Sequence, residues 1–207
     1  MTRRASSALG SLLLLLLFAG CGGSEAASNG QPEADAGSEP PAASASATEA
    51  IATQSVAAQA QELGVANARA PLPGLITAGQ PDEAQLAALA DAGIGTAVSF
   101  RPEGEPGAGW EEAFAADHPL TFHRIPVAGA ADLSRETVEE LDGLLAEAGD
   151  GPTLLYCASS NRVGALLALR AHWLQDVPAE EALQLGREAG LRSLEPAVAE
   201  LLGMEDR

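Results

Sequence analysis

Lysine is absent from this 207-residue sequence, and eleven arginines and three histidines are its only basic side chains. Twenty-nine aspartates and glutamates oppose them, so the formal net charge at pH 7 is -18. Proteins that bind the phosphate backbone of nucleic acids, or anionic membranes through polybasic segments, need surplus positive charge. The composition argues against both kinds of binding, and we expect no nucleic-acid partner.

Cysteine and aromatic residues are also scarce. The chain has two cysteines, Cys21 and Cys157, and its aromatic fraction is 3%. Cys21 is the predicted site of lipidation. The mature chain therefore keeps one free thiol and can form no internal disulfide. A lone thiol in an oxidising compartment is a liability unless it is buried or has a function. The histidines show no metal-ligand spacing, so we expect neither a metal nor a cofactor.

The N-terminal apolar run, Ala8 to Ala19, is too short to span a bilayer core, which needs roughly 20 residues. It follows two arginines, which is typical of a secretory signal. The run ends in Phe18-Ala19-Gly20-Cys21, which resembles the lipobox of bacterial lipoproteins. The resemblance implies a signal peptide over residues 1–20, lipidation of Cys21, and a membrane-anchored protein of the bacterial cell envelope that faces the periplasm or the exterior. An ordinary secretion signal is the alternative.

Residues 21–65 have the composition of a tether. From Gly22 to about Ala47 the chain is mostly Ala, Ser, Gly, Glu and Pro, which cannot bury enough apolar area to offset the entropy of ordering. Residues 48–65 show modest helical periodicity, so they form either an entry helix or more linker. Residues 66–207 are long enough for one domain with one core, which we expect to be monomeric.

Within residues 66–207, short apolar segments alternate with helical patterns. Strand candidates cover residues 75–78, 94–100, 120–127 and 152–156. Helix candidates begin near Asp82, Trp110, Ser134, Asn161, Pro178 and Ser193. Strands that alternate with helices form a parallel sheet covered by helices. The sequence therefore predicts an α/β fold, with a small, mostly parallel central sheet of four to five strands flanked by helices.

The most informative segment lies at the end of the last strand candidate. Cys157 is followed by a polar loop, Ala158-Ser159-Ser160-Asn161, and then by Arg162 at the start of a helical pattern. Backbone N–H groups of such a loop, together with the helix N-terminus, can hold an oxyanion. The same field favours the thiolate, which is the nucleophilic form of cysteine. Ligands of parallel sheets bind beyond the carboxyl ends of the strands, so this loop is the candidate active site.

Three segments in order carry a resemblance to a known family: Pro73 to Pro81, Phe100-Arg101-Pro102, and Tyr156 to Leu166. Together they resemble the β-lactamase-hydrolase-associated phosphatase-like family, a branch of the dual-specificity cysteine phosphatases. The resemblance covers nearly all of residues 66–175. It implies a cysteine-phosphatase-like fold, a phosphorylated substrate, Cys157 as nucleophile, Arg162 as phosphate clamp, and residues 158–161 as the backbone cradle.

Hydrolysis also needs a general acid to protonate the leaving alcohol. Asp132 is the best placed candidate, because it lies in the loop that follows a neighbouring strand. Weaker candidates are Glu103, Glu105 and Asp117.

The loop departs from the common phosphatase pattern at four points. Four residues separate Cys157 from Arg162 where five are usual, Tyr156 replaces a histidine, Ser160 replaces a glycine, and Val163 replaces a hydroxyl residue. If position 160 needs a positive φ, serine costs roughly 1 to 2 kcal/mol there. The resembled family shares the four-residue spacing, which also occurs in rhodanese-like sulfurtransferases, whose cysteine carries a persulfide. Sulfur transfer, or anion binding with weak catalysis, are therefore the alternatives to phosphatase activity.

Overall fold

The computed structural model describes residues 42–148 and 151–204, with side chains from residue 46 onward. They belong to one compact unit, residues 39–207. The predicted signal peptide, Cys21 and the first part of the predicted tether lie outside the described residues.

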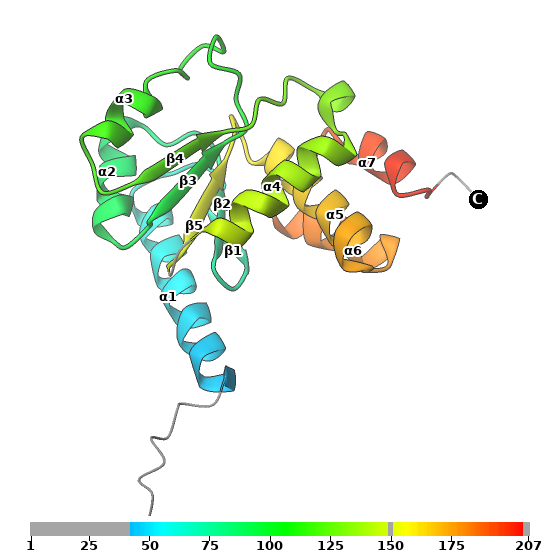
Figure 1. Cartoon of the computed structure of the whole chain (residues 1–207), viewed down its shortest axis with the longest axis horizontal. Coiled ribbons are helices and arrows are strands. Elements are labelled where there is room, and N and C mark those ends of the chain that lie inside the picture. The colour runs from blue at the N-terminus through cyan, green and yellow to red at the C-terminus, as the bar shows by residue number, and fades with distance from the viewer. Residues whose placement is uncertain (1–41, 149–150, 205–207) are drawn as a thin grey trace, which may run out of the picture. The chain divides into compact units, whose positions relative to one another are not determined.

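A five-stranded sheet forms the centre of the unit, in the order β1-β2-β5-β3-β4 (Figure 1). β1 pairs antiparallel with β2, whereas the other neighbours are parallel. The strands are β1 (Arg69–Leu72), β2 (Leu75–Ala78), β3 (Thr96–Ser99), β4 (Thr121–Arg124) and β5 (Thr153–Tyr156). The prediction of a small, mostly parallel sheet is confirmed.

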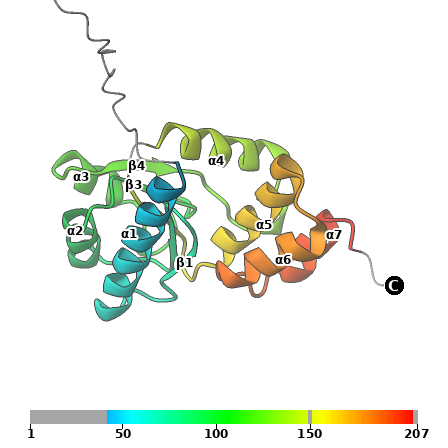
Figure 2. The ribbon, with the colours of Figure 1, turned by 90° about the horizontal axis from the view of Figure 1, so that it is seen from below.

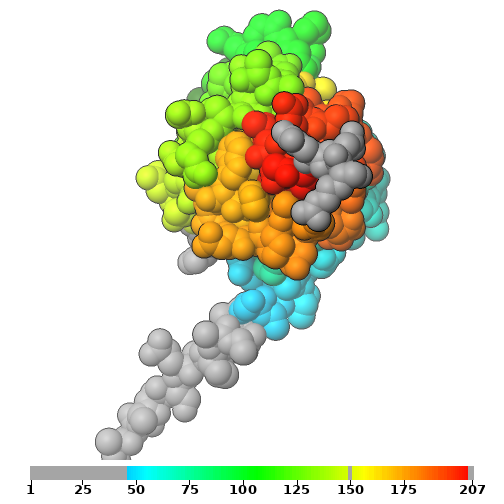
Figure 3. All heavy atoms as spheres, turned by 90° about the vertical axis from the view of Figure 1, so that its right-hand side faces the viewer, coloured from blue at the N-terminus to red at the C-terminus, as the bar shows by residue number. Residues whose placement is uncertain are grey.

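Helices cover both faces of this sheet. One face packs against α1 (Ala42–Glu62), α2 (Glu83–Asp91) and α3 (Glu111–Ala116), as the view in Figure 2 shows. The other packs against α4 (Arg135–Glu147), α5 (Asn161–Gln175), α6 (Ala179–Glu188) and α7 (Glu195–Leu201). Figure 3 looks onto this second layer, where the C-terminal helices form one continuous surface. A short 3-10 helix, η1 (Ala130–Asp132), precedes α4.

Two hydrophobic cores follow from this arrangement, one on each face of the sheet. Side chains along a strand alternate between faces, and in β5 Leu154 and Tyr156 join the α1–α3 core. Leu155 and Cys157 join the α4–α7 core. The thiol therefore lies on the same face as the helix that follows it.

Helix α1 extends the folded unit toward the N-terminus. It begins at Ala42, in a stretch that the sequence assigns to the tether. Alanine has the highest helix propensity, and one side of the helix is buried against the sheet and α2, through Thr53, Val56 and Ala60. The Thr53 hydroxyl also accepts a 2.9 Å hydrogen bond from the backbone N–H of Gly74. The folded domain therefore includes residues that precede position 66.

The strands differ in extent from the sequence prediction. β1, which the strand candidates did not include, is an edge strand that contains Pro71, and a proline is tolerated at a sheet edge. β3 and β4 have four residues each, shorter than the apolar segments that indicated them.

Among the described residues, no helix combines the length and apolar character that crossing a membrane requires.

Candidate active site at the carboxyl ends of the strands

The thiol loop leaves β5 at the edge of the sheet where the parallel strands end. Cys157 is 1% exposed, and its backbone N–H lies 3.4 Å from the carbonyl oxygen of Ala78, the last residue of β2. Gly79 forms an isolated bridge with Ser159. A Cβ on Gly79 would lie 3.1 Å from the Ala158 carbonyl oxygen. Gly79, the second glycine of the Pro73–Pro81 motif, thus permits the close approach of β2 to the loop.

Ser160 has the strained backbone that its sequence position suggested. Its φ is +69°, in the left-handed region that disfavours side chains. The residue is fully buried, and its hydroxyl donates a 2.7 Å hydrogen bond to the Ala189 carbonyl oxygen. Gly190 lies directly against it: a Cβ there would come within 2.6 Å of the Ser160 Cβ. Contacts with the α6–α7 connection therefore hold the strained residue.

Two asparagines tie the loop to neighbouring segments. The Asn67 amide donates to the Ser159 carbonyl oxygen at 3.2 Å. The Asn161 side-chain oxygen Oδ1 accepts from the Arg192 backbone N–H at 2.7 Å, and its side-chain amide donates to the Ser193 hydroxyl at 2.9 Å. The loop is thus fixed at both ends, whereas Ala158 and Ser159 are exposed. The role of residues 158–161 as a backbone cradle stays a prediction.

Arg162 is brought to the thiol and held there. Its two terminal nitrogens bind the two carboxylate oxygens of Glu105 at 2.8 and 2.9 Å. One of them also donates to the Val127 carbonyl oxygen at 2.9 Å. The pKa of Arg162 is raised, first by the hydrogen bonds with Glu105, which outweigh burial, and further by the interaction with Cys157. The structure therefore brings together the two residues that the sequence placed at either end of the loop.

Glu105 links Arg162 to a second arginine, Arg101, which is buried. Arg101 binds Glu105 at 2.9 Å through Nε, and donates to the Gln80 side-chain oxygen at 2.9 Å. Hydrogen bonds from Arg162 and, after the opposing effect of burial, from Arg101 lower the pKa of Glu105 to about 2. The sequence did not assign these roles to Arg101 and Glu105. The signal that could have found Arg101 is the Phe100-Arg101-Pro102 motif.

The same network continues to Tyr156 on the other face of the sheet. Gln80 and the Tyr156 hydroxyl donate to one oxygen of Glu111, at 3.2 and 3.3 Å. Arg124 binds its other oxygen at 2.9 Å. Burial alone would raise the pKa of this carboxyl, but hydrogen bonds from Arg124 and the Gly109 backbone outweigh it and lower the pKa. Burial and the charge of Glu111 raise the pKa of Tyr156, which is therefore neutral.

Asp132 lies in η1, in the loop between β4 and α4. One of its carboxylate oxygens accepts hydrogen bonds from the backbone N–H groups of Ala128 at 2.7 Å and Gly129 at 3.2 Å. These bonds give the side chain a role in holding its own loop. Its role as general acid stays a prediction. Glu105 is unsuited to that role, because with a pKa of about 2 it is ionised at neutral pH and has no proton to donate.

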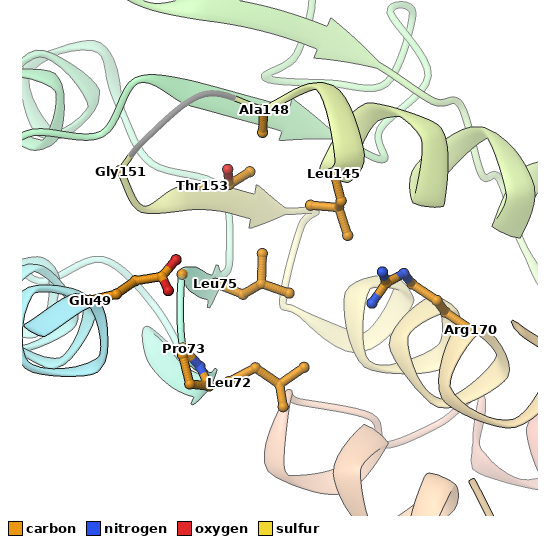
Figure 4. A pocket seen from close by; sticks show the side chains of 10 residues that line it. Glu49, Leu72, Pro73, Leu75, Leu145, Ala148, Gly151, Thr153 and Arg170 are labelled. Carbon is orange, nitrogen blue, oxygen red and sulfur yellow. The ribbon is translucent and has the colours of Figure 1, made fainter. Parts of the chain in front are cut away.

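Two surface hollows lie at opposite edges of the sheet. One, of about 410 Å³, is lined by Gln80, Pro81, Asp82, Glu83, Gly107 and Trp110, and Gln80 connects it to the Arg101–Glu105 network. The other, of about 350 Å³, lies where β2 and β5 begin (Figure 4). Arg170 points toward it but is bound by Asp142 at 2.7 Å. The first hollow, at the edge where the strands end, is on the side of the candidate site.

No family model matches the chain, and no curated protein does. Solved structures of similar fold include a candidate phosphatase (DUF442) from Shewanella putrefaciens CN-32, at a TM-score of 0.54 and 18% identity over 69% of this chain and 94% of that one. Another is a candidate phosphatase from Neisseria meningitidis Z2491, at a TM-score of 0.53 and 24% identity over 63% and 95%. A mutant form of Tk-PTP matches at a TM-score of 0.51 and 16% identity, over 66% and 95%. The chain therefore has a cysteine-phosphatase-like fold.

Proposed function

We propose that the chain is a metal-independent, cysteine-dependent phosphatase that acts on phosphomonoesters. The observation that carries the proposal is that Arg162, at the end of the loop that begins at Cys157, is bound through both of its terminal nitrogens by Glu105. A guanidinium that is held by one edge can offer its other edge to a phosphate. The fold, which it shares with the candidate phosphatases, supports the same conclusion.

The proposed reaction has two steps. The Cys157 thiolate attacks phosphorus in line, an S–P bond forms, and the P–O bond to the alcohol breaks. Asp132 gives its proton to the departing alkoxide. Water then attacks the thiophosphoryl group and gives a proton to the Asp132 carboxylate, the P–S bond breaks, and the thiolate and inorganic phosphate are released. Loop amides and Arg162 stabilise the negative charge of the phosphoryl oxygens in both steps.

Hydrolysis of p-nitrophenyl phosphate tests the proposal. We expect Cys157→Ser to abolish turnover, vanadate to inhibit the wild type, and Arg162→Ala to reduce kcat/KM at least a hundredfold. Arg170→Ala is the matched control, because it removes an arginine from the same helix whose carboxylate partner lies on α4. The turnover of this variant should stay near the wild-type rate.

Asp132→Asn tests the general acid. It should slow the hydrolysis of alkyl phosphates more than that of p-nitrophenyl phosphate, whose leaving group needs no proton. Equal rates in Cys157→Ser and wild type would refute the proposal.

Sulfur transfer is the competing function, favoured by the four-residue spacing between Cys157 and Arg162. It predicts cyanide-releasable sulfur on Cys157 after treatment with thiosulfate. Binding of phosphate without turnover would instead indicate an anion-binding protein. Mass spectrometry that shows an unmodified Cys157 after this treatment, together with phosphate release that requires Cys157, would support the phosphatase over the sulfurtransferase.

A further inference from the structure

Two arginines in the described residues differ from the rest in their partners. Six of the eight arginines there form ion pairs with carboxylates. Arg69 and Arg192 form none with a described carboxylate, although acidic residues outnumber arginines 29 to 11 in the chain. Arg69 donates to the Asn67 carbonyl oxygen at 2.9 Å, and Arg192 donates to the backbone carbonyl oxygens of Arg187 and Leu191.

Both arginines adjoin the thiol loop. Asn67, which accepts from Arg69, is the residue whose amide binds the Ser159 carbonyl oxygen. The backbone N–H of Arg192 donates to the Asn161 side chain at the other end of the loop. Arg69 is therefore linked to the segment between Cys157 and Arg162 through one residue, Asn67, and Arg192 is bonded to that segment directly through its backbone.

The segments that carry the two arginines are neighbours in the fold. α6, which leads to Arg192, contacts β1, which begins at Arg69. Burial and then the charge of Arg192 lower the pKa of Arg69. The charge of Arg192 contributes to lowering the pKa of Glu195, after the larger effect of Arg187. Glu195 is nevertheless bound through both carboxylate oxygens to Arg187, at 3.1 and 2.7 Å. An anion bound between the two arginines would relieve the repulsion between their like charges.

We propose that Arg69 and Arg192 form a second anion subsite, which binds another phosphate of a compact bisphosphorylated substrate whose first phosphate lies at Cys157. This inference rests on the proposed phosphatase function. Planar guanidinium groups match the geometry of a phosphate. The strongly acidic remainder of the chain would repel a long acidic peptide, which favours a small bisphosphate that meets only the arginines.

Alkanediol bisphosphates with spacers of two to eight carbons, each compared with the alkyl monophosphate of equal length, test the subsite. We expect one spacer length to give a kcat/KM at least tenfold above its monophosphate. Arg69→Gln and Arg192→Gln should each bring this ratio toward one, and rising salt should do the same to the wild type. Arg135→Gln removes a charge beside Trp173, near the end of α5 remote from the loop, and should leave the ratio unchanged.

Calorimetric binding of the same compounds to Cys157→Ser separates this inference from the proposed function. Tighter binding of the bisphosphate, lost in the Arg192→Gln background, would support the subsite even if the wild type showed no turnover. Arg192 is exposed, so its substitution should fold normally; a thermal melt checks this. A bisphosphate-to-monophosphate ratio that is one in the wild type, or that the two substitutions leave unchanged, would overturn the inference.

Discussion

At the scale of single residues, Glu105 decides the geometry of the candidate site. It binds Arg162 through both carboxylate oxygens and Arg101 through one of them. Its side chain is 25% exposed, so the ion pairs are only partly screened by water. The guanidinium of Arg162 is therefore oriented before any phosphate arrives, and binding need not supply the entropy of ordering it.

Replacing this carboxylate should cost both activity and stability. Glu105→Gln removes the charge that fixes Arg162, and we expect kcat/KM for p-nitrophenyl phosphate to fall at least tenfold. The folded-state pKa of about 2 lies below the ordinary value of 4.5. The stability from this pairing is therefore fully present above pH 4.5 and lost as the pH falls through about 2. At pH 7 the variant should lose roughly 1 to 3 kcal/mol.

Urea unfolding of the two proteins across this pH range measures the effect. The difference in unfolding free energy should shrink as the pH falls from 4.5 toward 2. Glu103→Gln is the control, because it removes the same charge from an exposed position in the same loop and should change stability by less than about 0.5 kcal/mol. A pH-independent difference would show that Glu105 acts by packing and not by charge.

At the scale of elements, the close packing of α5 on α6 supports the thiol loop from behind. A Cβ on Gly164 would lie 2.3 Å from the Leu191 backbone nitrogen and 2.5 Å from the Gly186 carbonyl oxygen. Backbone atoms cannot move aside as a flexible side chain does. The hydroxyl of Ser160 binds the Ala189 carbonyl oxygen in the same connection, so helix spacing and loop position are coupled.

Gly164→Ala should therefore destabilise the protein by roughly 1 to 3 kcal/mol, through overpacking against this backbone. Gly143→Ala is the matched control in α4, where the new methyl group meets nothing within 4 Å. That change should raise stability by roughly 0.5 to 1 kcal/mol, since alanine favours a helix more than glycine does. Denaturant midpoints of the two variants would move in opposite directions; a shift of the same sign in both would contradict this account of the α5–α6 contact.

Elements whose signals are local could be predicted from the sequence. Asp82 with Gln85 indicated a capping box, and both of its hydrogen bonds are present at the start of α2. The Ser134 cap of α4 is likewise confirmed. The partner of Arg162 could not be found in this way, because Glu105 lies 57 positions away in an irregular turn. Only the pairing of β3 and β5 brings that turn to the thiol loop.

At the scale of the whole molecule, α1 is part of the domain and not only a link to the N-terminus. Its side chains Val56, Ala57 and Ala60 belong to the core shared with α2 and β2. Its C-terminal end reaches the edge where the strands end, since the carbonyl oxygen of Leu63 accepts a hydrogen bond from Gln85 in the first turn of α2. The composition of this helix is close to that of the predicted tether, so only packing distinguishes the two.

A chain that begins at residue 39 should therefore be clearly more stable than one that begins at residue 66. The shorter chain exposes the apolar side chains beneath α1 and leaves the Gly74 N–H without its Thr53 acceptor, so we expect a lower Tm and binding of a hydrophobic dye. Substitutions in the longer chain separate burial from helix formation: Val56→Ala, at a position 6% exposed, should cost roughly 1 to 2 kcal/mol. Ile51→Ala, at a position 72% exposed in the same helix, should cost almost nothing. Equal melting temperatures for the two chains would mean that the sheet folds without α1, and the domain would then begin near residue 66.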